Sequence, residues 1–115
     1  MDIYKKGESI IFELTLKDED GTVIDLSGLD TIEVNVYNAA TEVTLKTGTY
    51  AGGEVTYDDA ATGVIQLHIE DGLTSLAEAN YYNYCCTVTA TDADFDDSTN
   101  TSIATGTAFQ IINGC

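Results

Sequence analysis

The chain has 115 residues, of which 43% are hydrophobic and 9% aromatic, so it can form one domain, residues 1–115, with its own apolar core. Its 20 acidic and 4 basic residues give a formal net charge of −16. This charge argues against nucleic acid and against an anionic membrane as partners, because both are bound through clustered Lys and Arg. No apolar run is long enough to span a membrane, and none follows Met1 as a secretion signal would, so we expect synthesis in a cytoplasm.

The basic residues lie towards one end of the sequence. All four lysines fall within residues 1–46, together with ten acids, whereas residues 47–115 hold ten acids and no base. The adjacent Lys5 and Lys6 make the one basic spot, and we predict that this terminal segment docks through them on an acidic neighbour. The alternative is that both lysines only solubilise a frayed terminus.

The dominant sequence pattern has a period of two, which is typical of half-buried β-strands. Apolar residues at every second position from Ile10 to Leu16 predict the first strand, and an Asp-Gly turn follows at residues 18–21. Residues 25–30 predict a corner. Further strands are predicted, in chain order, over residues 22–24, 32–37, 42–47, 54–57 and 64–69.

The second half of the chain begins with the only predicted helix, over residues 71–78, which we expect to carry the chain from one sheet to the other. The longest predicted strand follows over residues 80–91. Because side chains alternate across a strand, Tyr82 and Tyr84 are predicted to face the core, which leaves Tyr81 as an exposed aromatic on the opposite face.

The chain ends with a predicted acidic loop over residues 92–102 and a closing strand in which Phe109 and Ile111 face the core. Together these elements predict an all-β fold, an immunoglobulin-like antiparallel β-sandwich of about seven or eight strands with one short helical crossover. The residues predicted to be buried between its two sheets are Phe12, Leu14, Ile32, Val34, Val36, Ile65, Leu67, Val88 and Phe109.

Three cysteines, two of them adjacent, favour neither a disulfide nor a zinc site. Neighbouring strand residues point to opposite faces, so a bond between Cys85 and Cys86 is geometrically awkward, and the chain has one histidine and no CxxC spacing. We interpret Cys86 as a small buried hydrophobe and Cys115 as a frayed end. Reduced thiols also suit assembly in a cytoplasm.

The acidic loop contains the only metal candidates, Asp92, Asp94 and Asp96. Alternating carboxylates can gather the hard oxygen ligands that calcium requires. The loop departs from the EF-hand pattern, however, because Asp97 stands where glycine is needed and Ile103 where the bidentate glutamate belongs. We therefore predict a hydrated loop without a metal, and no cofactor for the chain as a whole.

The sequence lacks a recognisable catalytic arrangement, so we predict that this protein is not an enzyme. Nucleophilic catalysis needs a base beside the nucleophile, and His68, the only imidazole, lies on the polar face of a predicted strand. Close pairs of carboxylates do not indicate a catalytic site here, because so acidic a chain contains such pairs by chance. No phosphate-binding glycine loop precedes a helix.

The first strands carry a family resemblance. The run from Gly7-Glu8 through Phe12 to Gly28, with its Asp-Glu-Asp-Gly turn and Ile-Asp-Leu-Ser-Gly corner, resembles the opening of the small β-sandwich modules of tailed-phage virions. It is similar above all to the N-terminal module of upper baseplate proteins, and the later segments follow that layout loosely. These motifs consist of residues that form turns and strands, so the resemblance implies a fold more than a particular function. Baseplate proteins continue past this module, whereas this sequence ends at Cys115.

We therefore expect a virion structural protein that is made in the host cytoplasm and acts by assembly with other virion proteins or with copies of itself. Capsid decoration by an auxiliary protein is favoured over a tail or baseplate adaptor. A module that binds a host glycan or another surface ligand through Tyr81 is the alternative. The partner-binding residues predicted from the sequence are Lys5, Lys6 and Tyr81.

Overall fold

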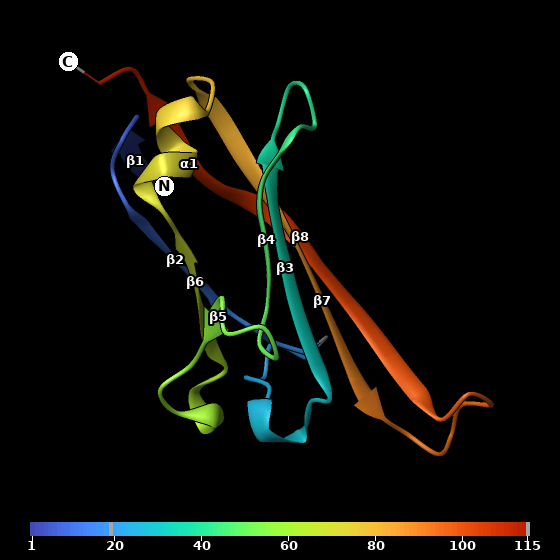
Figure 1. Cartoon of the computed structure of the whole chain (residues 1–115). Helices are drawn as coiled ribbons and strands as arrows, with labels where there is room; N and C mark the ends of the chain where they lie inside the picture. Colours follow the sequence, from blue (N-terminus) through green and yellow to red (C-terminus); the bar gives the residue numbers. More distant parts are fainter. Residues whose placement is uncertain (19, 115) are drawn as a thin grey trace.

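A computed structural model describes residues 1–18 and 20–114, so the expectation for Cys115 lies outside the described residues. The described chain forms eight strands in two sheets, which confirms the all-β sandwich fold (Figure 1). The five-stranded sheet has the order β1-β8-β7-β3-β4 and the three-stranded sheet the order β2-β6-β5. The strands are β1 (Asp2–Lys5), β2 (Ile10–Thr15), β3 (Thr31–Asn38), β4 (Thr44–Thr49), β5 (Val55–Thr56), β6 (Val64–Ile69), β7 (Asn80–Thr91) and β8 (Thr99–Ile112).

The strand order is that of an immunoglobulin sandwich. Strands β2, β6 and β5 occupy the places of strands B, E and D, and β4, β3, β7 and β8 those of C′, C, F and G. The predicted crossover is confirmed: helix α1 (Asp71–Leu76) follows β6 of one sheet and precedes β7 of the other. The pairing is antiparallel except between β1 and β8, which run parallel.

The core lies between the inner faces of the two sheets, as the alternation predicted. Seven of the nine residues predicted to be buried are buried, whereas Phe12 and Leu14 are only partly buried. Both belong to β2, which lies at the edge of the three-stranded sheet, and Figure 1 shows the β7–β8 hairpin diverging from that sheet along its length. Tyr82 is buried, as expected, and Tyr84 lies half-buried beside Phe12, with ring centroids 5.4 Å apart.

An aromatic cluster around Phe109 joins four strands of the core. The Phe109 ring centroid lies 5.6 Å from that of Tyr4, 6.0 Å from that of Phe12 and 5.8 Å from that of Tyr82. These partners come from β1, β2 and β7, so one side chain of β8 contacts both sheets. Aromatic pairs at such separations stabilise a core beyond the apolar area that they bury.

The crossover is fixed by two buried hydroxyl groups. The Tyr82 hydroxyl donates to the Glu78 carbonyl over 2.8 Å, which is the tyrosine-corner contact that many immunoglobulin-like sandwiches make at the start of strand F. The Thr74 hydroxyl, fully buried in α1, donates over 2.7 Å to the Glu8 carbonyl that precedes β2. Because a buried polar group needs a partner, both contacts fix where the helix sits.

The structure corrects several expected boundaries. The N-terminal segment is not frayed, because β1 pairs in register with β8 from Asp2 opposite Phe109 to Lys5 opposite Ile112. The return segment 22–24 makes one isolated bridge, between Lys17 and Val23, instead of a strand. The edge strand begins after Val43, whose side chain is 65% exposed and not inward.

The acidic loop is also shorter than predicted. It ends at Ser98, and β8 begins at Thr99, because residues 99–103 pair with residues 91–87 of β7 in unbroken register. The result is a long β7–β8 arm with the acidic loop at its tip (Figure 1).

Truncation of Phe109 tests the core. Phe109→Ala is expected to lower the free energy of unfolding by about 3–5 kcal/mol, since it removes a fully buried ring that contacts both sheets. Phe12→Ala serves as the matched control and should cost clearly less, because Phe12 is only partly buried. Urea unfolding of both variants measures the difference. Equal losses would show that the two sheets close more tightly over β2 than described.

Candidate functional site

The outer face of the five-stranded sheet is the largest regular surface that the strands build. Residues opposite each other in a sheet share a face, so the registers place neighbours side by side across it. One row runs from Thr49 through Glu33 and Thr87 to Ile103, and the next row includes Thr47, Asn35, Cys85 and Thr105. The face is therefore made largely of short polar side chains, most of them threonine.

Hydrogen bonds between its own side chains hold part of this face in place. The Thr47 hydroxyl donates to the Asn35 side-chain oxygen over 3.0 Å, across β4 and β3. The hydroxyl groups of Thr31 and Thr89 contact each other across β3 and β7. Because β-branched side chains are also stiff at χ1, this surface has little side-chain freedom to lose on binding.

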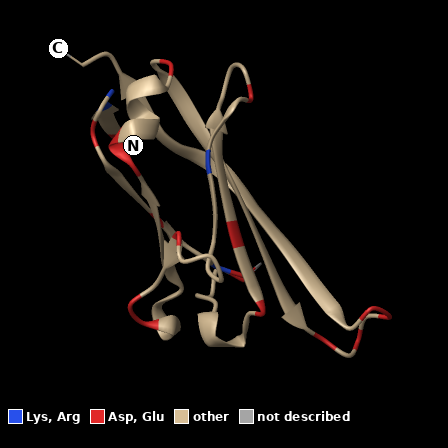
Figure 2. Cartoon of the chain, viewed as in Figure 1, with Lys and Arg blue, Asp and Glu red and all other residues tan. Residues whose placement is uncertain are grey.

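The face is nearly free of charge in a strongly acidic protein. Within the described strands, the registers place only Glu33 and Lys5 as charged residues on it. Figure 2 shows the acidic residues mainly in turns and at the tip of the arm, with β7 and β8 free of charge along their lengths. An interface core is depleted of charged residues in the same way.

The acids gather in the turns because aspartate side chains build those turns. Five aspartate carboxylates, in four loops, each accept a hydrogen bond from the backbone amide two residues further on. These aspartates are Asp18, Asp25, Asp59, Asp92 and Asp97. The contact with Ser27, through both its hydroxyl and its amide, lowers the pKa of the Asp25 carboxyl. Much of the negative charge thus belongs to turn chemistry.

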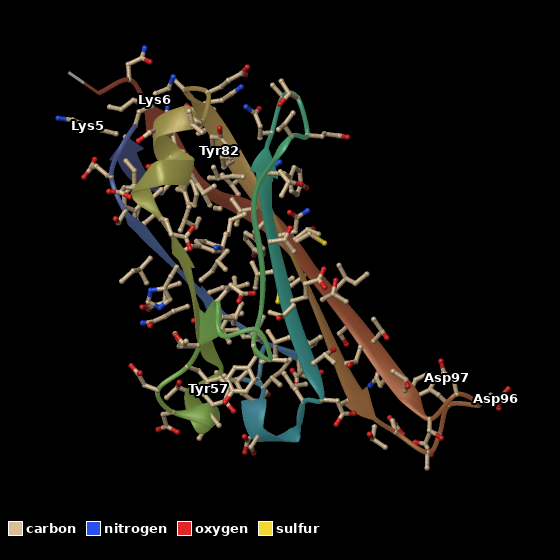
Figure 3. All side chains as sticks on the ribbon, viewed as in Figure 1. Lys5, Lys6, Tyr57, Tyr82, Asp96 and Asp97 are labelled. Carbon is tan, nitrogen blue, oxygen red and sulfur yellow. The ribbon has the colours of Figure 1, made fainter. Side chains whose placement is uncertain are left out.

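The structure brings two of the three predicted partner-binding residues to this face. Tyr81 is 47% exposed and lies opposite Gln110, which in turn lies opposite Ile3 of β1. Lys5 is exposed on the same side of β1, two residues beyond Ile3. Lys6 follows β1, is half-buried, and donates its backbone amide to the Ile112 carbonyl. Figure 3 shows Lys5 projecting from the sheet at the end remote from Asp96 and Asp97.

A groove beside α1 forms a second candidate surface, which the sequence did not reveal. It has a volume of about 280 Å³ and lies between α1, the start of β4 and the buried Tyr82. Leu76 and Val43 line it with side chains 87% and 65% exposed. In the sequence, the only indication of this groove was the apolar Leu76 in the short predicted helix.

Of the three metal candidates of the acidic loop, only Asp92 accepts a hydrogen bond from the local backbone, as the neighbouring Asp97 also does. Asp92 accepts from the Asp94 amide over 3.0 Å, and Asp97 accepts from the Thr99 amide over 3.0 Å. Asp94 and Asp96 are exposed, and they lie at the tip of the arm with Asp97 (Figure 3). Within residues 1–18 and 20–114, no three His, Cys, Asp or Glu side chains are grouped to hold a metal ion.

The two adjacent cysteines differ in environment, as expected from their alternation. Cys86 is buried in the core, and this burial, with a smaller contribution from Cys85, raises the pKa of its thiol to about 12. Cys85 is half-buried on the outer face, opposite Asn35 and Thr105. Cys86 is therefore a structural thiol, because only the thiolate is a good nucleophile.

His68 is exposed on β6, with its Nε2 atom 3.4 Å from the Thr56 hydroxyl, which confirms its expected surface position. Among the described helices, none has the length and apolar character that crossing a membrane requires. No protein-family model matches the chain, and no curated protein matches it either.

The acidic loop should not respond to calcium. We expect the melting temperature to stay within about one degree between EDTA and millimolar calcium, because a ligand that bound only the folded state would raise it. Asp94→Asn should melt like the wild type. A rise of several degrees with calcium that Asp94→Asn abolishes would contradict this prediction.

Thiol labelling at pH 8 should separate the two cysteines. We expect iodoacetamide to modify Cys85 in the folded protein, and Cys86 only after unfolding, as read by tandem mass spectrometry.

The pH dependence of the free energy of unfolding is a second test of the Cys86 thiol. Above pH 9 the thiol ionises in the unfolded chain but not in the fold, so the free energy of unfolding should fall with rising pH up to about 12. The slope for this one thiol is at most about 1.4 kcal/mol per pH unit. Cys86→Ala should reduce that slope, and an unchanged slope would contradict the assignment.

Proposed function

We propose that this protein is a structural protein of a tailed-phage virion that acts by protein–protein assembly, as an auxiliary protein decorating the capsid. The observation that carries the proposal is the neutral, threonine-rich outer face of the five-stranded sheet, which also bears Lys5 and Tyr81. The resemblance of residues 7–28 to phage β-sandwich modules supports the same class of function.

The charge of the molecule limits which of its surfaces can meet another protein. A net charge of −16 repels acidic partners from most directions, so contact is least unfavourable where carboxylates are few. The outer face meets this condition within the described strands. Across five strands and along the length of β7 it measures on the order of 800 Å², which is the usual contribution of one partner to a stable interface.

Lys5 at one end of this face, with Lys6 next to it in the chain, gives the docking a preferred orientation. Lys5 is exposed beside Ile3, an apolar side chain that is 59% exposed, so a basic and an apolar contact lie next to each other. An acidic rim on the partner would be attracted to Lys5 and Lys6 while its apolar and polar core covers the sheet. This combination favours a virion neighbour over a free small ligand.

Attachment to particles tests the proposal. Particles assembled without the protein are mixed with purified wild type and with the Lys5→Glu, Lys6→Glu double variant, and bound protein is measured after sedimentation. The double variant should keep its melting temperature yet lose at least about tenfold in occupancy, and added salt should weaken wild-type attachment because exposed charges are screened. Lys17→Glu changes the net charge by the same amount as Lys5→Glu alone. A comparison of these two single variants therefore separates the position of the charge from the change in net charge.

The same assay tests the face itself. Thr47→Arg places a long charged side chain on the outer face and should reduce occupancy, whereas Thr15→Arg on exposed β2 of the other sheet should not. Wild-type protein that fails to bind particles, but binds a glycan array through Tyr81, would replace assembly with surface-ligand binding as the function.

A further inference from the structure

Strand β8 has a long edge without a neighbouring strand. On one side β7 pairs with it from Thr99 to Ile111. On the other side β1 covers only Phe109 to Ile112. Within the described chain, residues 100–108 therefore present an unpaired row of backbone amides and carbonyls on that side. Such a row is a template for another strand.

This edge lacks the usual protection against pairing. Natural edge strands are blunted by charged side chains, proline or a covering segment. Residues 99–112 contain no charged residue, and the chain contains no proline. All residues from Thr99 to Thr105 are exposed, and Ile103 in their middle is 64% exposed. Figure 1 shows the arm extending beyond the three-stranded sheet.

The other sheet edges differ from β8 in length and charge. The edge strand β4 has six residues and contains Lys46, which is ion-paired to Glu70 over 2.7 Å. The edge strand β2 contains the exposed Glu13. The edge strand β5 has only two residues. Among these edges of the described chain, β8 thus has the longest run of residues without a charged side chain.

We propose that the β8 edge binds the β8 edge of a second copy of this chain, antiparallel about a two-fold axis at Ile103. A two-fold contact uses the same patch on both copies, so the patch has to complement itself. In this register Thr101 lies opposite Thr105 of the second copy, and Ile103 lies opposite its equivalent. Each pair is neutral and either β-branched or small, which is the kind of cross-strand pair that stabilises a sheet.

The charges beyond the paired segment favour the same arrangement. Pairing has to stop near residue 107, because β1 occupies the edge from Phe109 onwards. In antiparallel register the acidic loop of each copy, residues 92–98, then lies alongside β1 of the other copy. Asp2 opposes this approach, whereas Lys5 and Lys6 at the far end of β1 attract the carboxylates of the loop. The four aspartates of the loop and the two lysines of residues 1–8 lie at opposite ends of β8, so only the antiparallel arrangement brings them to the same end of the dimer, where Asp2 and Glu8 oppose the contact.

The inference goes beyond the proposed function, because it concerns the purified protein alone. Sedimentation velocity from about 10 µM to about 1 mM should show a reversible dimer for the wild type. Ile103→Lys places two like charges opposite each other and should raise the dissociation constant at least about tenfold. Ile11→Lys is the matched control: Ile11 is 54% exposed on β2, and the change in charge is identical. Melting temperatures of both variants check that they fold.

A cross-link tests the position of the two-fold axis. With Cys85 and Cys115 replaced by serine, Ile103→Cys should form a disulfide-linked dimer under mild oxidation, because opposed strand residues lie within disulfide distance. Ile11→Cys in the same background should stay unlinked. A wild type that remains monomeric at about 1 mM, a dimer indifferent to Ile103→Lys, or equal cross-linking at both positions would each overturn the inference. Since particle attachment is measured with Thr47→Arg on another strand, failure of one test leaves the other intact.

Discussion

The contact of Phe109 with both sheets is the constraint on which the rest of this structure depends. Its ring meets Tyr4, Phe12 and Tyr82, so it ties the N-terminal strand, the three-stranded sheet and the start of β7 to one point of β8. The register between β7 and β8 shifts directly beside it: Tyr82 is opposite Phe109, but Asn83 is opposite Thr107. A bulge of this kind bends a strand and increases its twist.

That bulge separates two parts of β8 with different roles. On the Ile112 side the strand lies under the core aromatics and accepts β1 as its parallel neighbour. On the Thr99 side it extends into the arm, where its residues 99–105 are all exposed (Figure 1). Gly106 stands at the transition, where an added Cβ would come within 2.9 Å of the Tyr84 ring. Packing of the core thus determines where the free edge begins.

The acidity of the chain has a local origin but a global effect. Carboxylates that accept turn amides lie in the loops between strands, whereas β7 and β8 carry no charge and the described outer face of the five-stranded sheet carries only Glu33 and Lys5. The result is a molecule that repels its neighbours from its loops and permits contact along its sheet. Both the proposed assembly face and the proposed self-pairing edge follow from this separation of charge.

The sequence by itself determined seven of the eight strands, most of their inward residues, the crossover helix and the environments of Cys86 and His68. Those features follow from local alternation and turn chemistry, which each short segment carries within itself. Only the tertiary structure decided that Lys5 and Tyr81 share a face, because the parallel pairing of β1 with β8 joins residues from opposite ends of the chain. It alone decided that the arm extends to Thr99 and that Phe12 stays partly exposed. Register and the divergence of two sheets are set by contacts between distant segments, and no local pattern in a chain encodes how far such segments remain together.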